Sequence, residues 1–238
     1  MLAIFKRELK SYFYSPIAYV LIGFFILLSS VFFLPNLTEG NTWFTGNLST
    51  MAVFLVFIVP ILTMRILAED RKNGTEVLLI TSPTNLTNIV LGKYFAAFSV
   101  FLVMTCITFA YPVILMIFGN PPMPQIIGGY IGFIFLGAAF IAVGLFASSL
   151  TENQVIAAVV GFVGLLIMWV MDGVSNMFAN VLWGKLSMIL DWFSLLSRYQ
   201  DFSAGILNLG PIMYYVSFSA VFLFLTIRVI EKRRWSQG

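Results

Sequence analysis

The stretch IIGGYIGFIFLGAAFIAVGLFASSL, residues 126–150, contains no charged residue, and only TENQ separates it from a second apolar stretch, VIAAVVGFVGLLIMWVM at 155–171. An α-helix rises about 1.5 Å per residue, so roughly 20 apolar residues cross the hydrocarbon core of a bilayer. Backbone amides surrounded by lipid must be paired within their own segment, which favours helices. The two stretches therefore predict two antiparallel membrane-spanning helices that are neighbours.

Small residues recur at four-residue spacing along both stretches. In a membrane this spacing lets helix backbones approach closely. Glycine and alanine are also frequent in membrane helices for no specific reason, so the pattern leaves both interpretations open. The pairs are Gly128 and Gly132, Ala138 and Ala142, Gly144 and Ser148, and Ala157 and Gly161.

The composition extends this prediction to the whole chain. Of its 238 residues, 60% are hydrophobic and 10% are charged, and the mean hydropathy is +0.98, whereas an ordinary soluble domain has about 25% charged residues. The sequence predicts an all-α membrane protein with one six-helix membrane domain, residues 16–238. The expected spans are Ile17 to Leu34, Met51 to Leu67, Tyr94 to Phe118, Ile126 to Leu150, Val155 to Met171 and Leu209 to Ile227, and Pro35 is expected to follow the end of the first.

Basic residues indicate how these spans are oriented. With the N-terminus in the cytosol, eleven of the thirteen Lys and Arg residues lie inside, and only Lys185 and Arg198 lie outside. Cytoplasmic loops carry the excess of Lys and Arg in membrane proteins. We therefore expect both termini in the cytosol.

Residues 1–15 predict an amphipathic helix at the membrane surface. Phe5 belongs to an apolar stripe with helical spacing, and Lys6, Arg7 and Lys10 lie largely on the other side. Such a helix sinks its apolar face into the acyl boundary and turns its cations toward anionic headgroups. An alternative is that these cations only orient the protein. The first span lacks a cleavage site and is longer than a signal-peptide core, so we expect it to be retained.

The long polar segment between the second and third spans, RILAEDRKNGTEVLLITSPTNLTNIVLGK at 65–93, has internal structure. Asn73 and Gly74 predict a turn, the following residues a short helix with an apolar flank, and Pro83 its end. A short helix held below the membrane can dock on a cytosolic partner. The alternative is a solvated connector, although three consecutive large apolar residues are unusual in one.

This segment resembles the coupling helix of ABC-2 type ABC transporter permeases, with the pattern E-x-x-x-x-G-T-x-E-x-L-L-x-x-P and a later Gly92-Lys93. The resemblance implies that residues 68–92 dock on a separate ATPase subunit, which would bind ATP and Mg, and that a second permease copy or a related permease completes the pathway. It also implies a bacterial cytoplasmic membrane. The implied docking residues are Glu69, Arg71, Lys72, Gly74, Thr75, Glu76, Leu78, Leu79 and Pro83.

Three further stretches are similar to the gliding-motility-associated permease subfamily. They are ELKSYFYSPIAYV at 8–20, SRYQDFSAGILNL at 197–209 and EKRRW at 231–235. This narrower resemblance concerns the subfamily and does not imply motility.

The outside segment 173–208 is rich in interfacial residues, including Trp183, Trp192 and Tyr199. It resembles the re-entrant hairpin of ABC-2 permeases, and we expect short helices on or in the outer leaflet. Whether they gate a pathway or only pack there stays open.

The residue types that are missing narrow the function. The chain has no histidine and one cysteine, Cys106, and neither Lys93 nor Lys185 follows a P-loop pattern. We therefore expect no metal site, no cofactor on this chain and no catalytic site. We also expect no nucleic-acid partner, whereas membrane lipids are expected to surround the spans.

Three functions fit this sequence to different degrees. The spans carry no ionisable residue near their middle, which disfavours an ion channel or a secondary transporter. A membrane scaffold for a cytosolic ATPase stays open, since its docking helix would look the same. The favoured function is the permease subunit of an ATP-driven exporter with an amphiphilic or polymeric cargo.

Overall fold

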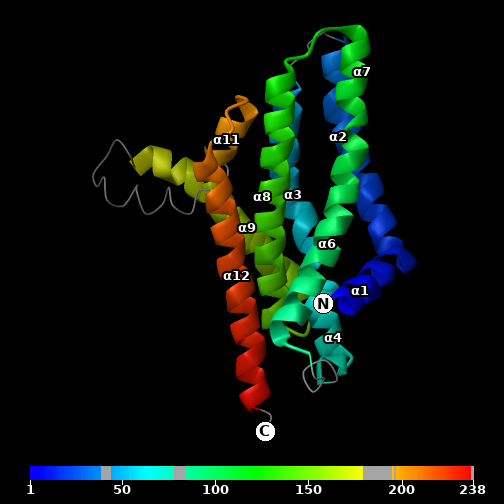
Figure 1. Ribbon diagram of the computed structural model, residues 1–238, viewed down its shortest axis with the longest axis vertical. Helices are drawn as coiled ribbons and strands as arrows, with labels where there is room; N and C mark the ends of the chain where they lie inside the picture. Colours follow the sequence, from blue (N-terminus) through cyan, green and yellow to red (C-terminus); the bar gives the residue numbers. More distant parts are fainter. Residues whose placement is uncertain (39–43, 78–83, 179–194, 196, 237–238) are drawn as a thin grey trace.

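The computed structural model describes residues 1–38, 44–77, 84–178, 195 and 197–236, and the regular structure in this part of the chain is helical throughout (Figure 1). Six helices in it are long and apolar enough to cross a membrane, as the sequence predicts. They are Pro16–Thr38, Thr45–Lys72, Leu86–Phe118, Met123–Leu150, Gln154–Met171 and Leu209–Arg233.

Ten described helices make up this bundle, and two of the spans consist of consecutive helices. The short α1 (Leu2–Tyr14) precedes α2 (Pro16–Thr38). The second span combines α3 (Thr45–Thr63) and α4 (Arg65–Lys72), and the third combines α6 (Leu86–Thr108) and α7 (Ala110–Phe118). They are followed by α8 (Met123–Leu150), α9 (Gln154–Phe178), α11 (Ser197–Ser203) and α12 (Leu209–Ser236).

Helix α8 forms the centre of the bundle and packs against α12, α3 and α9. In its apolar middle 72% of the residues are buried, against 17% for α9 and 28% for α2 and α12. The outer helices therefore leave large apolar faces open, as expected where lipid or another membrane protein covers them. The contact between α8 and α9 confirms that the two stretches joined by residues 151–154 are neighbours.

The close packing of α11 against α8 explains the small-residue pair Gly128 and Gly132. A Cβ atom added to Gly128 would lie 2.6 Å from the carbonyl oxygen of Phe202, and one added to Gly132 would lie 2.6 Å from its Cβ atom. Phe202 is fully buried on α11. The absence of side chains at these two positions thus lets α11 lie against α8.

Several boundaries differ from the prediction, and the largest difference is at the third span, which begins at Leu86 and not at Tyr94. Helix α2 continues through Pro35 to Thr38, and the Thr38 hydroxyl donates to the carbonyl of Pro35 over 3.1 Å. The second span begins at Thr45, six residues before the predicted Met51. Hydrophobicity locates the apolar core of a span, whereas a helix can continue past that core wherever its backbone bonds stay satisfied.

The polar parts of the chain gather at one end of the bundle. Helix α1 lies across the foot of the helices, beside α4, and the C-terminal end of α12 extends past the same end (Figure 1). Six spans require both termini on one side. The assignment of that side to the cytosol rests on the distribution of Lys and Arg.

Candidate functional site

The described docking residues lie on α4 and in the turn that follows it. Helix α4 carries Glu69, Arg71 and Lys72. Gly74 forms the predicted turn with φ +72°, a left-handed conformation that a residue with a Cβ rarely adopts. Thr75 to Val77 form the first helical turn beyond it, and Leu78, Leu79 and Pro83 lie outside the described residues.

A serine on α8 fixes the joint between α3 and α4. The Ser148 hydroxyl accepts from the amides of Leu67 and Ala68, both over 3.1 Å, and donates to the carbonyl of Met64 over 3.0 Å. One side chain thereby pairs three backbone groups where the helix is interrupted at Met64. Because α8 is the central helix, α4 is tied directly to the core.

A buried lysine joins three helices beneath this joint. The side chain of Lys93 on α6 is 1% exposed, and its Nζ lies 2.6 Å from Asp70 Oδ2 on α4 and 3.1 Å from Glu8 Oε1 on α1. It also donates to the carbonyl of Ile66 over 2.7 Å. Arg7 adds a second cation, 2.6 Å from Glu8 and 3.7 Å from Asp70. We call Glu8, Asp70, Lys93 and Arg7 the charged junction.

Charge is balanced within the charged junction, which holds two carboxylates and two cations. A buried ion is stable only where partners offset its desolvation. Partial burial acts to lower the pKa of Arg7, but the hydrogen bond and charge of Glu8, with the charge of Asp70, outweigh it and raise that pKa overall. Thr75 extends the network, because its hydroxyl donates to Asp70 Oδ1 over 2.8 Å. The turn after α4 is thus attached to the junction.

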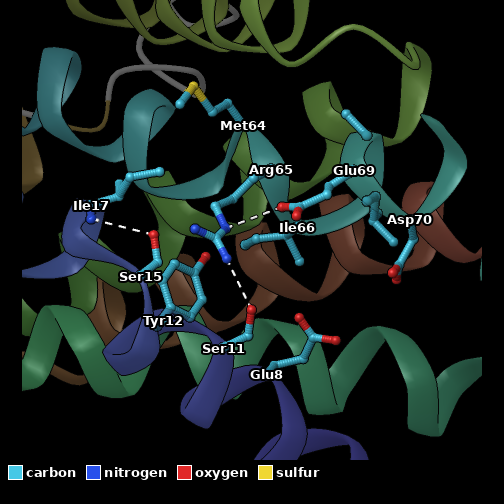
Figure 2. A network of polar contacts seen from close by, with 12 residues as sticks. Glu8, Ser11, Tyr12, Ser15, Ile17, Met64, Arg65, Ile66, Glu69 and Asp70 are labelled. Atoms are coloured by element: carbon cyan, nitrogen blue, oxygen red, sulfur yellow. Dashed lines mark hydrogen bonds and ion pairs between the residues drawn. The ribbon is translucent and has the colours of Figure 1, made fainter. Parts of the chain in front are cut away.

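A second contact between α1 and α4 is centred on Arg65 (Figure 2). Its guanidinium donates to Ser11 over 2.9 Å, pairs with Glu69 at 3.3 Å, and lies 5.4 Å from the ring centroid of Tyr12. The Tyr12 hydroxyl donates to the carbonyl of Leu62 over 2.8 Å. Burial raises the pKa of Tyr12, so the phenol stays neutral and can donate.

On its other side the segment is tied to α8, α9 and α12. Arg71 lies 2.6 Å from Glu152 in the turn between α8 and α9. Glu76 lies 3.5 Å from Arg233 near the end of α12, and Arg233 also donates to the carbonyl of Ser149. The segment is therefore in contact with α1 and with four other spans, through α6, α8, α9 and α12.

These pairs divide the predicted docking residues into two groups. Glu69, Arg71 and Glu76 each pair with a residue of this chain. Lys72 is exposed and makes no ion pair within the described residues, and Gly74 is exposed beside it. A cavity of about 280 Å³ between α1 and α4 is lined by residues that include Arg65, Glu69 and Asn73. Lys72, the turn and this cavity form the accessible surface of the segment.

The predicted membrane-interface residues are also divided. Lys6 and Lys10 are exposed and Phe5 is half-buried. Arg7, by contrast, pairs with the carboxylates of the charged junction. Helix α1 thus turns one cation toward the protein and two away from it.

Sequence reasoning gave no role to Glu8, Asp70, Glu152 or Arg233, and it named Ser148 only as a small residue four positions after Gly144. The charged residues among them could have been recognised as candidates for ion pairs. Only 10% of the chain is charged, and charged groups near membrane spans are costly unless they are paired. Their partners lie far away along the chain, so spacing alone could not pair them.

The six apolar helices and the charged segment at one end of them define a multi-pass membrane protein. Residues 32–231 match the family described as "ABC-2 family transporter protein", and the chain belongs to this family. It is a membrane permease, a transport component of a family that is generally not catalytic itself and that associates with an ABC ATPase. Among curated proteins, none matches the chain.

Proposed function

We propose that this permease is the membrane subunit of an ATP-driven exporter, coupled through residues 68–92 to a separate ATPase that binds ATP and Mg. It acts with a second copy of itself or a related permease, in a bacterial cytoplasmic membrane, with both termini in the cytosol. The proposal also places the permease closest to the gliding-motility-associated subfamily, which it resembles. Its pathway carries an amphiphilic or polymeric cargo.

One observation supports the coupling proposal: the end of α4 and the turn after it contact several helices, and not only the two helices that they join. Asp70 and Thr75 connect it to Lys93 and Glu8, and Glu76 connects it to Arg233. A solvated connector needs none of these contacts. A push on this segment is therefore transmitted to α1, α6 and α12 together.

In the proposed mechanism, these contacts transmit a displacement from the ATPase to the membrane spans. Closure of the ATPase on ATP displaces the turn at Gly74, and the Ser148 joint lets α4 tilt against α8 while its backbone groups stay paired. Lys93 passes the displacement to α6, the start of the third span. The two spans then rotate relative to the central helix and change access to the pathway.

The test is the variant Gly74→Ala in permease reconstituted with its ATPase in liposomes. Gly74 has φ +72° and open space where a Cβ would lie, so alanine reshapes the turn without a clash, at a cost of about 1–2 kcal/mol. We expect ATP hydrolysis to continue while transport falls severalfold. The Lys72→Gln variant should weaken copurification with the ATPase.

Gly210→Ala is the matched control, because Gly210 also has open space but an ordinary backbone conformation. It should leave coupling unchanged. Normal transport by Gly74→Ala and normal copurification by Lys72→Gln together would contradict docking at this segment. If the ATPase binds the permease but no cargo crosses under any condition, the chain is a scaffold instead.

A further inference from the structure

The angle between α1 and α2 encloses a hollow of about 340 Å³, lined by Leu9, Lys10, Phe13, Tyr14 and Tyr19. Ser15 is extended, with φ −91° and ψ 140°, as expected for a residue before proline. The chain therefore turns sharply from a helix lying across the bundle into the first span (Figure 1). The rings of Phe13 and Tyr19 meet edge to face at 6.1 Å and form one wall.

The polar groups around this hollow are unpaired within the described residues. Lys10 is exposed and makes no ion pair there, unlike Arg7 and Lys93 of the charged junction. Tyr14 is 87% exposed and Tyr19 59%, and neither hydroxyl forms a hydrogen bond in this part of the chain. Tyrosines with an apolar ring and a free hydroxyl are typical of the membrane interface.

We propose that this hollow binds the headgroup of one anionic phospholipid of the leaflet in which α1 lies. The phosphate accepts from Lys10 Nζ and from the hydroxyls of Tyr14 and Tyr19. The first acyl carbons lie on Leu9 and Phe13. This site is independent of any ATPase and needs only that α2 spans the membrane.

Charge favours an anionic over a zwitterionic lipid. No carboxylate lines the hollow, so the cationic end of a phosphatidylcholine would find no counter-charge beside Lys10. Glu8, the nearest acidic residue along α1, pairs with Arg7 and Lys93 instead. A cation with an apolar stem at this depth extends toward the headgroups.

The test measures binding of single phosphatidylglycerol and phosphatidylcholine molecules to the detergent-purified full chain by native mass spectrometry. Detergent removes the extended lipid surface, so general attraction to a charged membrane does not contribute. We expect the wild-type protein to retain one phosphatidylglycerol, and Lys10→Gln to lower its affinity roughly tenfold, as for loss of a charge-assisted hydrogen bond. Tyr19→Phe should cause a smaller loss.

Two control variants each remove one positive charge at a position outside the hollow. Lys6 lies on α1 one turn earlier but does not line the hollow, and Lys72 lies on α4; both are exposed. Lys6→Gln and Lys72→Gln should each change the affinity by less than about twofold. Equal losses in all three variants, or equal retention of phosphatidylcholine by the wild type, would overturn the site. Since Lys10 is exposed and unpaired, unchanged thermal unfolding of Lys10→Gln without lipid checks that the variant is folded.

Discussion

The two ends of the helix bundle are held together by different interactions. At the end with α1 and α4, ion pairs join the helices, with Lys93, Asp70 and Glu8 at their centre. At the opposite end, rings connect α2, α7, α8 and the start of α3: Phe33 stacks on Tyr111 at 4.6 Å, and Phe44, the residue before α3, stacks on Tyr130 at 5.8 Å. None of the ion pairs among the described residues lies at this end; the Tyr111 and Ser30 hydroxyls form a neutral hydrogen bond at 2.9 Å, and Arg198 lies 3.8 Å from the ring centroid of Tyr214.

This difference has a mechanical consequence. Long charged side chains can change rotamers and exchange partners while the backbones move, whereas interlocked rings and closely packed backbones resist displacement. We infer that the charged end receives a displacement and the aromatic end resists it.

Lys93→Met should be the most destabilising substitution. It removes a buried cation and leaves Arg7 as the one cationic partner of Glu8 and Asp70 among the described residues. Removing one partner of a buried ion pair costs about 3–5 kcal/mol. The free energy of unfolding in detergent, measured with denaturant, should fall by this amount.

The double variant Lys93→Met with Asp70→Asn provides the control. Because it removes a carboxylate together with the cation, part of the lost stability should return, which a double-mutant cycle would quantify. If the two substitutions are additive, the junction contributes no coupling between α4 and α6.

Ser148→Ala should cost less, about 1–3 kcal/mol, since two amides and a carbonyl lose their shared partner at the joint. Ser149→Ala is the matched control, because the Ser149 hydroxyl only donates to Phe146 within its own helix. Hydrogen exchange at Leu67 and Ala68 should increase in Ser148→Ala alone. Equal exchange in both variants would show that the joint does not depend on Ser148.

The spans could be predicted because a bilayer imposes one length and one kind of backbone pairing on every crossing segment. The turn at Gly74 could be predicted too, since Asn-Gly is a local signal and the structure has φ +72° there. Helix ends such as Thr45 and Thr38 could not, because they lie beyond the apolar core, where the thickness of the bilayer no longer sets the length of a helix.

The charged junction illustrates what sequence reasoning misses. Glu8 and Lys93 are 85 positions apart, and Glu76 and Arg233 are 157 apart. Periodicity assigns a residue to a face of its own helix but not to a partner on another helix. The family resemblance did highlight Lys93, yet only the fold brings it to Asp70.

At the aromatic end, Gly132→Ala should cost about 1–3 kcal/mol, the range for overpacking of a core. The added methyl group would lie 2.6 Å from the Cβ atom of the fully buried Phe202, which would have to move away from α8. Gly23→Ala is the control: nothing lies within 4 Å of its added Cβ, and alanine is the better helix former. A loss of stability in both variants alike would remove close packing as the explanation.

The smallest effect is expected for Arg71→Gln, at the edge of the charged end. Arg71 and Glu152 lie 2.6 Å apart, but their side chains are 29% and 58% exposed, and exposed pairs contribute about 0–1 kcal/mol. Stability should therefore hardly change, and the small loss should vanish at high salt. Exchanging the charges, with Arg71→Glu and Glu152→Arg together, should restore it at low salt. A loss above 2 kcal/mol in the single variant would mean that this exposed pair is not a weak contact that can exchange partners, which would contradict the contrast at the edge of the charged end.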